Sequence, residues 1–177
     1  MKTRKQNRKF GYDYSQDNLY FVTICVQDRK CCFGNVEGTG RDLSVHDADC
    51  KPSAKVELNE FGIIVYNQWK WVENQYPYVY LHSFIVMPNH FHGILEIDRT
   101  GRDLSVLENV KIKSLSELIG AYKTTSSKKI HEAGLFDFSW QRSFHDHIIR
   151  NDISYERISN YIDTNAERWK ADTFFEL

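Results

Sequence analysis

The spacing of hydrophobic and polar residues along the chain predicts two kinds of secondary structure. Runs rich in β-branched and aromatic residues predict four strands, over 18–27, 79–87, 90–97 and 142–149. Apolar residues that recur every three or four positions predict three helices, over 59–75, 114–131 and 154–169. Pro88-Asn89 separates the second and third strands and predicts that these two strands form a hairpin.

The order strand, helix, strand, strand, helix, strand, helix predicts an α+β protein. This order is typical of a ferredoxin-like split βαβ unit, in which helices cover one face of an antiparallel sheet. The third helix is an added C-terminal helix. Two helix starts carry capping residues, because Asn59 suits an N-cap and Ser114 with Glu117 has the spacing of a capping box.

A seven-residue sequence, TGRDLSV, occurs at 39–45 and again at 100–106. Both copies fall in predicted connections, where a fold tolerates insertions, and two short copies are too few for a solenoid. We therefore expect one domain over 1–177. Its expected subdivisions are a basic arm over 1–17 and repeat-bearing loop insertions over 35–57 and 98–112.

The composition is that of a folded protein, because 41% of the 177 residues are hydrophobic and 27% are charged. No apolar run approaches the roughly 20 residues that a membrane span needs, and the N-terminus lacks the apolar segment of a secretory signal. The four cysteines are too few and too clustered for a disulfide framework. We therefore expect a cytoplasmic protein that does not associate with a membrane.

The net charge of −1 hides a segregation of charge along the chain. Residues 1–10 carry five basic residues and no acidic one, and residues 111–150 carry seven basic and four acidic residues. Clustered cations bind the phosphates of nucleic acid, and unpaired bases stack on aromatic side chains, which make up 14% of this chain. The candidate DNA-binding cations in these two segments are Lys2, Arg4, Lys5, Arg8, Lys9, Lys123, Lys128 and Lys129.

His90-Phe91-His92 is the sharpest candidate for chemistry. Residues i and i+2 of a strand point to the same face, so the two imidazoles would lie side by side and suit a divalent ion. Two packed histidines on a half-buried strand would show the same pattern, and His145-Asp146-His147 repeats it. A zinc site from Cys31, Cys32, His46 and Cys50 is disfavoured, because adjacent cysteines lack the usual spacing of a zinc knuckle.

The last predicted helix carries the second candidate. Its core stripe leaves Tyr161 on the flank, about 100° away at 3.6 residues per turn. Asn165 is four residues later and Arg157 four residues earlier, so the three side chains are expected to share that flank. An amide and a guanidinium beside a phenol could bring a phosphate and a metal to it, although a tyrosine at the edge of a core is usually a packing residue.

Together these segments resemble a known family. The run Val86-Met87-Pro88-Asn89-His90-Phe91-His92-Gly93-Ile94 resembles the His-hydrophobic-His motif of the single-strand-specific HUH tyrosine transposases of the insertion-sequence 200/605 type. The runs SLSELIGAYKTTSSKKI, FSWQRSFHDHIIRN and YIDTNAERW resemble the REP-associated branch of that family. The resemblance extends over most of residues 18–169, apart from the two repeat-bearing loops.

The resemblance implies a ferredoxin-like fold and a metal-dependent DNA transesterase. It implies that His90 and His92 bind Mg²⁺ or Mn²⁺, that Asn165 completes the metal site and that Tyr161 is the nucleophile. Cleavage beside a single-stranded DNA hairpin would leave a 5′-phosphotyrosine, in DNA transposition by a monomer or a homodimer. Arg157 is expected to contact the DNA. Ala166 departs from the branch, which often has proline there, but alanine favours a helix.

Two alternatives remain open at this point. The chain could be a domesticated relative that binds hairpin DNA but has lost cleavage, or a structural ferredoxin-like domain whose histidines only pack. A covalent protein–DNA adduct would exclude the first alternative. An effect of His90→Ala on metal binding would exclude the second.

Overall fold

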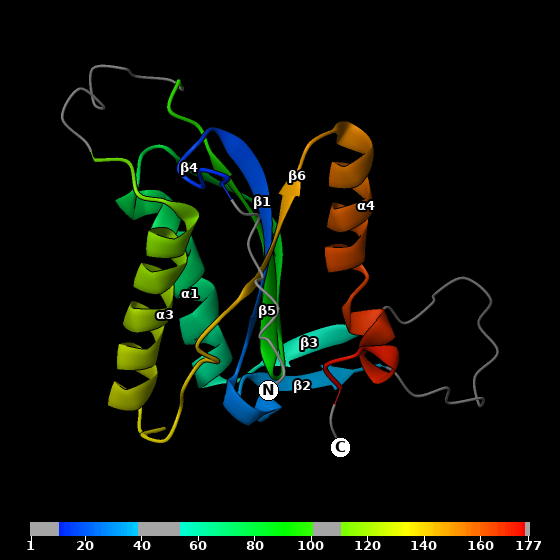
Figure 1. Ribbon diagram of the computed structural model, residues 1–177. Coiled ribbons are helices and arrows are strands. Elements are labelled where there is room, and N and C mark those ends of the chain that lie inside the picture. Colours follow the sequence, from blue (N-terminus) through cyan, green and yellow to red (C-terminus); the bar gives the residue numbers. More distant parts are fainter. Residues whose placement is uncertain (1–10, 39–53, 101–110, 176–177) are drawn as a thin grey trace, which may run out of the picture.

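The computed structural model of the protein describes residues 11–38, 54–100 and 111–175 (Figure 1). A four-stranded sheet with the order β4-β5-β1-β6 forms its centre, and every neighbouring pair is antiparallel. Its strands are β1 (Asn18–Cys25), β4 (Val79–Met87), β5 (His90–Ile97) and β6 (His145–Ile149). This arrangement confirms the predicted α+β, ferredoxin-like fold class.

The two faces of the sheet carry different helices (Figure 1). Helices α1 (Glu60–Gln75) and α3 (Leu115–Glu132) cover one face, and α4 (Asp152–Asp163) covers the other. None of the helices in the described segments has the length and apolar character needed to cross a membrane.

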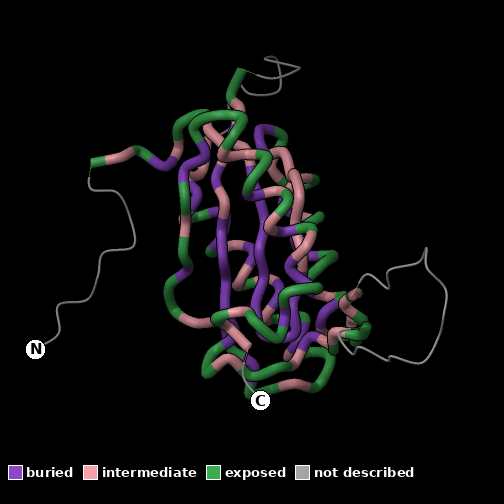
Figure 2. The backbone as a smooth tube through the Cα atoms, turned by 90° about the vertical axis from the view of Figure 1, so that its right-hand side faces the viewer, coloured by how far each residue is buried: buried purple, intermediate pink, exposed green. Residues whose placement is uncertain are grey.

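The main core lies between the sheet and the α1–α3 layer. Trp69 of α1 is its centre, with ring centroids 4.6 Å from Phe91 of β5 and 5.1 Å from Tyr122 of α3. A smaller apolar cluster lies under α4, formed by Ile94, Ile149, Ile158 and Ile162. Figure 2 shows the buried strands running through the middle of the molecule between these layers.

The predicted capping residues start both helices of the larger layer. The Asn59 side chain accepts hydrogen bonds from the amides of Phe61 and Gly62 at the start of α1. At the start of α3, Ser114 and Glu117 form the predicted capping box. Each cap satisfies backbone donors that the first turn leaves unpaired, so local sequence defines where both helices begin.

A two-stranded sheet, which was not predicted, joins β2 (Gly34–Glu37) and β3 (Lys55–Leu58) in antiparallel register. These strands stand at the ends of the expected insertion over 35–57. The first repeat copy lies outside the described residues, and Thr100 alone of the second copy lies inside them. Strands of four residues carry too little periodicity to be recognised from sequence.

The last helix is shorter than predicted. Helix α4 ends at Asp163, and a 3₁₀ helix, η2 (Ala166–Ala171), follows after Thr164 and Asn165. Aspartate, threonine and asparagine favour non-helical conformations because their side chains compete for backbone hydrogen bonds. The prediction of one continuous α-helix over 154–169 was therefore wrong, although Asn165 keeps helical backbone angles and lies beside Tyr161 as expected.

Candidate metal and nucleophile site

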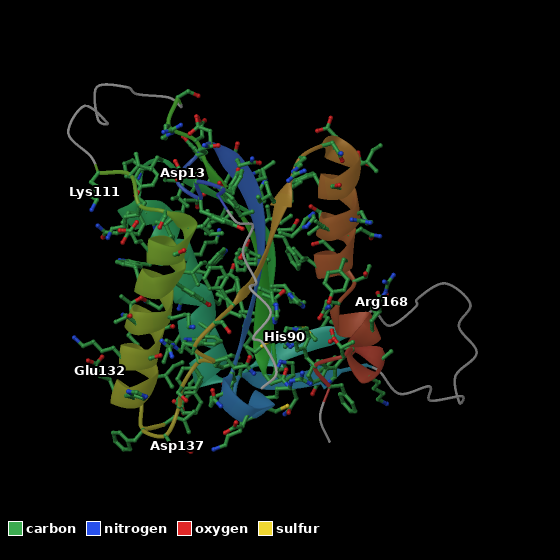
Figure 3. The ribbon with its side chains drawn as sticks, in the orientation of Figure 1. Asp13, His90, Lys111, Glu132, Asp137 and Arg168 are labelled. Atoms are coloured by element: carbon green, nitrogen blue, oxygen red, sulfur yellow. The ribbon has the colours of Figure 1, made fainter. Side chains whose placement is uncertain are left out.

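His90 and His92 stand at the start of β5, directly after the turn that joins it to β4. Both imidazoles are buried, with 0% and 1% exposure, and their ring centroids are 4.5 Å apart. Phe91 between them points into the main core, as alternation on a strand requires. Figure 3 shows His90 near the end of the sheet, at the level of η2, which carries Arg168.

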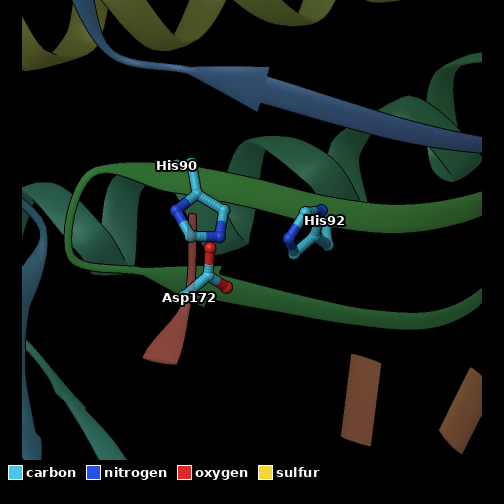
Figure 4. Close-up of side chains that lie close together, drawn as sticks. All are labelled: His90, His92 and Asp172. Atoms are coloured by element: carbon cyan, nitrogen blue, oxygen red, sulfur yellow. The ribbon is translucent and has the colours of Figure 1, made fainter. Parts of the chain in front are cut away.

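A carboxylate completes a three-residue cluster. Asp172, which follows η2, lies against the two imidazoles (Figure 4), and one ligating atom from each of His90, His92 and Asp172 lies within 4.8 Å of the others. Among the described residues, no other group of three histidines, thiols or carboxylates is gathered this closely. Asp172 was not among the predicted ligands, because no periodic spacing relates it to His90, His92 or Tyr161 in the sequence.

The Nδ1 atoms of both imidazoles already have partners. Nδ1 of His90 lies 2.8 Å from Oδ1 of Asn89, and Nδ1 of His92 lies 2.8 Å from Oγ1 of Thr23. Such outer partners are typical of histidines that bind metals through the second ring nitrogen. In the described part of the chain, Nε2 of His90 is buried and has no hydrogen-bond partner.

Burial keeps both imidazoles neutral. It lowers the pKa of His90 to about 3, with a further contribution from the positive charge of Arg29. The pKa of His92 is also held well below its usual range, first by burial and then by His90, although Asp172 opposes the shift. Neutral imidazoles have a free lone pair at pH 7, which is the form that binds a metal.

Tyr161 projects from α4 onto this cluster. Its hydroxyl lies 3.3 Å from Nε2 of His92, and the ring of Phe21 contacts both side chains. Burial and the Asp172 carboxylate raise the pKa of the Tyr161 phenol, while a hydrogen bond from Asn165 and the charge of Arg168 lower it. The phenol is therefore protonated at pH 7 in the metal-free protein.

Asn165 reaches the site from the turn between α4 and η2. It is fully buried, and its Nδ2 lies 3.3 Å from Oδ2 of Asp172. Its Oδ1 is buried without a hydrogen-bond partner among the described residues, like Nε2 of His90. Two unpaired acceptors beside a carboxylate fit a divalent cation.

Aromatic rings from the C-terminal segment close one side of the cluster. The ring of Phe174 lies 4.7 Å from His90, and Trp169 of η2 lies 5.9 Å from it. Arg29 donates a hydrogen bond to the carbonyl of Thr173 and stands over the Phe174 ring. The segment is thus attached to the rest of the molecule where it covers the imidazoles.

The predicted DNA-binding residues that the structure describes lie on two helices, α3 and α4. The arm residues Lys2, Arg4, Lys5, Arg8 and Lys9 lie outside the described residues. The three candidate lysines of α3 lie across the sheet from His90, and Lys123 donates to the carbonyls of Gln141 and Arg142. Arg157 is exposed on α4. His145 and His147 are exposed on β6, and His46 and Cys50 of the zinc alternative lie outside the described residues.

A second hydrogen-bonded group lies at the other end of α4. His82 stands between Tyr155 and Glu96, 3.0 Å from the phenol oxygen and 3.0 Å from the carboxylate. The three side chains line a cleft of about 990 Å³ between the start of α4 and the sheet. This group connects the first turn of α4 to β4 and β5.

No protein-family model matches the chain. The solved structure of a REP-associated tyrosine transposase bound to a REP hairpin aligns with a TM-score of 0.53 at 17% identity, covering 92% of this chain and 72% of that one. The two proteins share a fold. A protein of Haemophilus influenzae described as uncharacterised is 30% identical over 185 residues, covering 97% of this chain and 93% of that protein. The chain belongs to the same family as this Haemophilus influenzae protein.

Proposed function

We propose that the protein is a metal-dependent DNA transesterase that cleaves and rejoins single strands next to hairpins, with Tyr161 as the nucleophile. The observation that carries the proposal is the convergence of three separate segments on one point. Strand β5 brings two neutral imidazoles, α4 brings a phenol and the segment after η2 brings a carboxylate. A transposase with the same fold supports the choice of single-stranded hairpin DNA as substrate.

The residues that would hold the ion are His90, His92 and Asp172, with Asn165 offering its free oxygen. Asp172 replaces Asn165 as the third principal ligand, because its carboxylate lies within reach of both imidazoles. When bound, Mg²⁺ or Mn²⁺ would act as a Lewis acid that polarises the scissile phosphate and stabilises the charge of the transition state.

Tyr161 performs the bond exchange. Its phenol oxygen attacks phosphorus in line, the bond from phosphorus to the 3′-oxygen breaks, and the phenol proton ends on that oxygen. The products are a 5′-phosphotyrosine and a free 3′-OH, so no water is consumed and a 3′-OH can later reverse the step. A phenol with a pKa near 10 is a weak nucleophile, which is why the cation beside it matters.

The proposal also includes the domain organisation, the oligomeric state and the DNA contacts of the protein. The chain acts as one domain over 1–177, as a monomer or a homodimer, and the cations of its arm contact the hairpin backbone. Lys128 and Lys129 would contact DNA that passes around the molecule, because α3 lies on the far side of the sheet from Tyr161. Arg157, exposed on the helix of the nucleophile, would contact the strand near the cleavage point.

A search for covalent adducts tests the proposal. Labelled hairpin oligonucleotides from the DNA that flanks its own gene are incubated with the protein and Mn²⁺ or Mg²⁺, then run on a denaturing gel. We expect an adduct with the wild type and with the control Tyr155→Phe, and none with Tyr161→Phe. An adduct with Tyr161→Phe would refute the role of Tyr161, and hairpin binding without any adduct would favour the inactive, DNA-binding alternative.

A further inference from the structure

Asn89 is fully buried at the turn between β4 and β5, next to the first of the paired histidines. Backbone hydrogen bonds hold this turn in place, because the Asn89 carbonyl accepts from the amide of Val26 and the Pro88 carbonyl accepts from Cys32 and Phe33. Backbone hydrogen bonds thus hold the turn itself, and the Asn89 side chain makes separate contacts with Arg29, Phe174 and His90.

The side-chain amide of Asn89 can be oriented from its partners. One side-chain atom, Nδ2, lies 3.0 Å from the carbonyl oxygen of Arg29 and 2.7 Å from that of Phe174. Carbonyl oxygens only accept hydrogen bonds, so the nitrogen must face them and both of its N–H groups are used. The other atom, Oδ1, then faces Nδ1 of His90 at 2.8 Å.

This orientation determines where the proton of His90 lies. An amide oxygen cannot donate, so Nδ1 must carry the proton in the 2.8 Å contact. In a neutral imidazole whose single proton is on Nδ1, the other ring nitrogen, Nε2, bears the lone pair. Nε2 is the ring atom that has no other partner in the described segments, and it belongs to the cluster with His92 and Asp172.

We propose that Asn89 is a positioning residue that holds His90 in the Nδ1–H tautomer and so presents Nε2 to the divalent ion. The inference rests on the metal site of the proposed function. Outer partners of this kind usually change metal affinity 10- to 100-fold when they are removed. The same amide connects three segments around the site, since its partners lie after β1, on β5 and after η2.

The tautomer can be measured without metal or DNA. Long-range ¹H–¹⁵N correlation spectra of the metal-free protein distinguish a protonated from an unprotonated ring nitrogen. We expect a protonated Nδ1 and an unprotonated Nε2 for His90 in the wild type. In Asn89→Leu, which removes the acceptor at similar volume, we expect the proton to shift toward Nε2 and Mn²⁺ affinity to fall 10- to 100-fold by calorimetry. A proton on Nε2 in the wild type would overturn the proposal, as would wild-type tautomer and affinity in Asn89→Leu.

Three further variants separate the positioning role of Asn89 from a general loss of the fold. Thr23→Val removes the partner of His92 and should leave the His90 spectrum unchanged, whereas Asn89→Asp keeps an acceptor oxygen and should keep the Nδ1–H tautomer. Gln68→Leu replaces another buried amide, on α1 across the sheet, and should change neither tautomer nor affinity. If Asn89→Leu does not fold, the wild type and Asn89→Asp spectra still decide. If the expected tautomer is found but no DNA adduct forms, the result contradicts the proposed function and leaves the proposed role of Asn89 intact.

Discussion

The hydroxyl of Tyr161 lies 3.3 Å from Nε2 of His92, so the proposed nucleophile and a proposed metal ligand share one hydrogen-bond contact. When the proton of His92 is on Nδ1, the lone pair of Nε2 cannot accept a hydrogen bond from the phenol and bind a cation at the same time. Metal binding would therefore release the Tyr161 hydroxyl from the imidazole and leave it free to approach a phosphate.

This competition predicts the effect of Tyr161→Phe on metal binding. Removing the hydroxyl removes the competing hydrogen bond, whose net worth is about 0.5–1.5 kcal/mol. We expect Mn²⁺ affinity, measured by calorimetry without DNA, to stay the same or to rise by up to roughly tenfold. A fall in affinity of similar size would mean that the phenol itself is a ligand.

The buried His90 predicts how stability depends on pH in the metal-free protein. Its pKa is about 3 in the folded state and near 6.5 in the unfolded chain, so the unfolded state binds more protons between these values. The free energy of unfolding should rise with pH across that window, by at most about 1.4 kcal/mol per pH unit from this residue, and level off above it. Urea unfolding from pH 4 to 8 measures this slope.

The variant His90→Gln assigns the slope to that residue. It should make the profile shallower in this window, leaving the part that the buried His92 contributes, whereas His147→Gln, at an exposed position on β6, should not. Profiles of equal slope in His90→Gln and the wild type would contradict the assignment.

Asp172→Asn tests the third ligand. An amide lacks the negative charge and the strong acceptor oxygens of a carboxylate, so Mn²⁺ affinity should fall by roughly tenfold or more, while the fold is retained. Asp163→Asn is the matched control, because Asp163 is an exposed carboxylate at the end of α4. Equal Mn²⁺ affinities in Asp172→Asn and Asp163→Asn would instead favour Asn165 as the third metal ligand.

The basic arm predicts a salt dependence. The five cations in residues 1–10 would release counterions on binding, about 0.7–0.9 per phosphate neutralised. A variant with these five residues changed to serine should show a slope of log affinity against log salt that is shallower by roughly 3.5 to 4.5. An unchanged slope, measured by fluorescence anisotropy of a labelled hairpin, would show that the arm does not contact DNA.

Local signals predicted most of the fold. The capping residues Asn59 and Ser114 and the alternation along β5 each act over a few residues, and they placed two helices and the paired imidazoles correctly. Asp172 was not predicted, because it is distant from His90 in the sequence and only the tertiary fold brings the two side chains together. Tyr161 and Asn165 are neighbours as expected, with a hydrogen bond from Asn165 to the phenol, although α4 ends between them.

Helix α4 packs through Ile158 and Ile162 against Ile94 and Ile149 of the sheet, in a cluster that is separate from the main core. Elements with a small buried contact open at a lower free energy than the whole protein, and their amide hydrogens exchange first. The amides of α4 should thus exchange with solvent deuterium faster than those of α1, which is packed around Trp69. The helix that contains Tyr161 can therefore separate from the sheet while the main core stays folded.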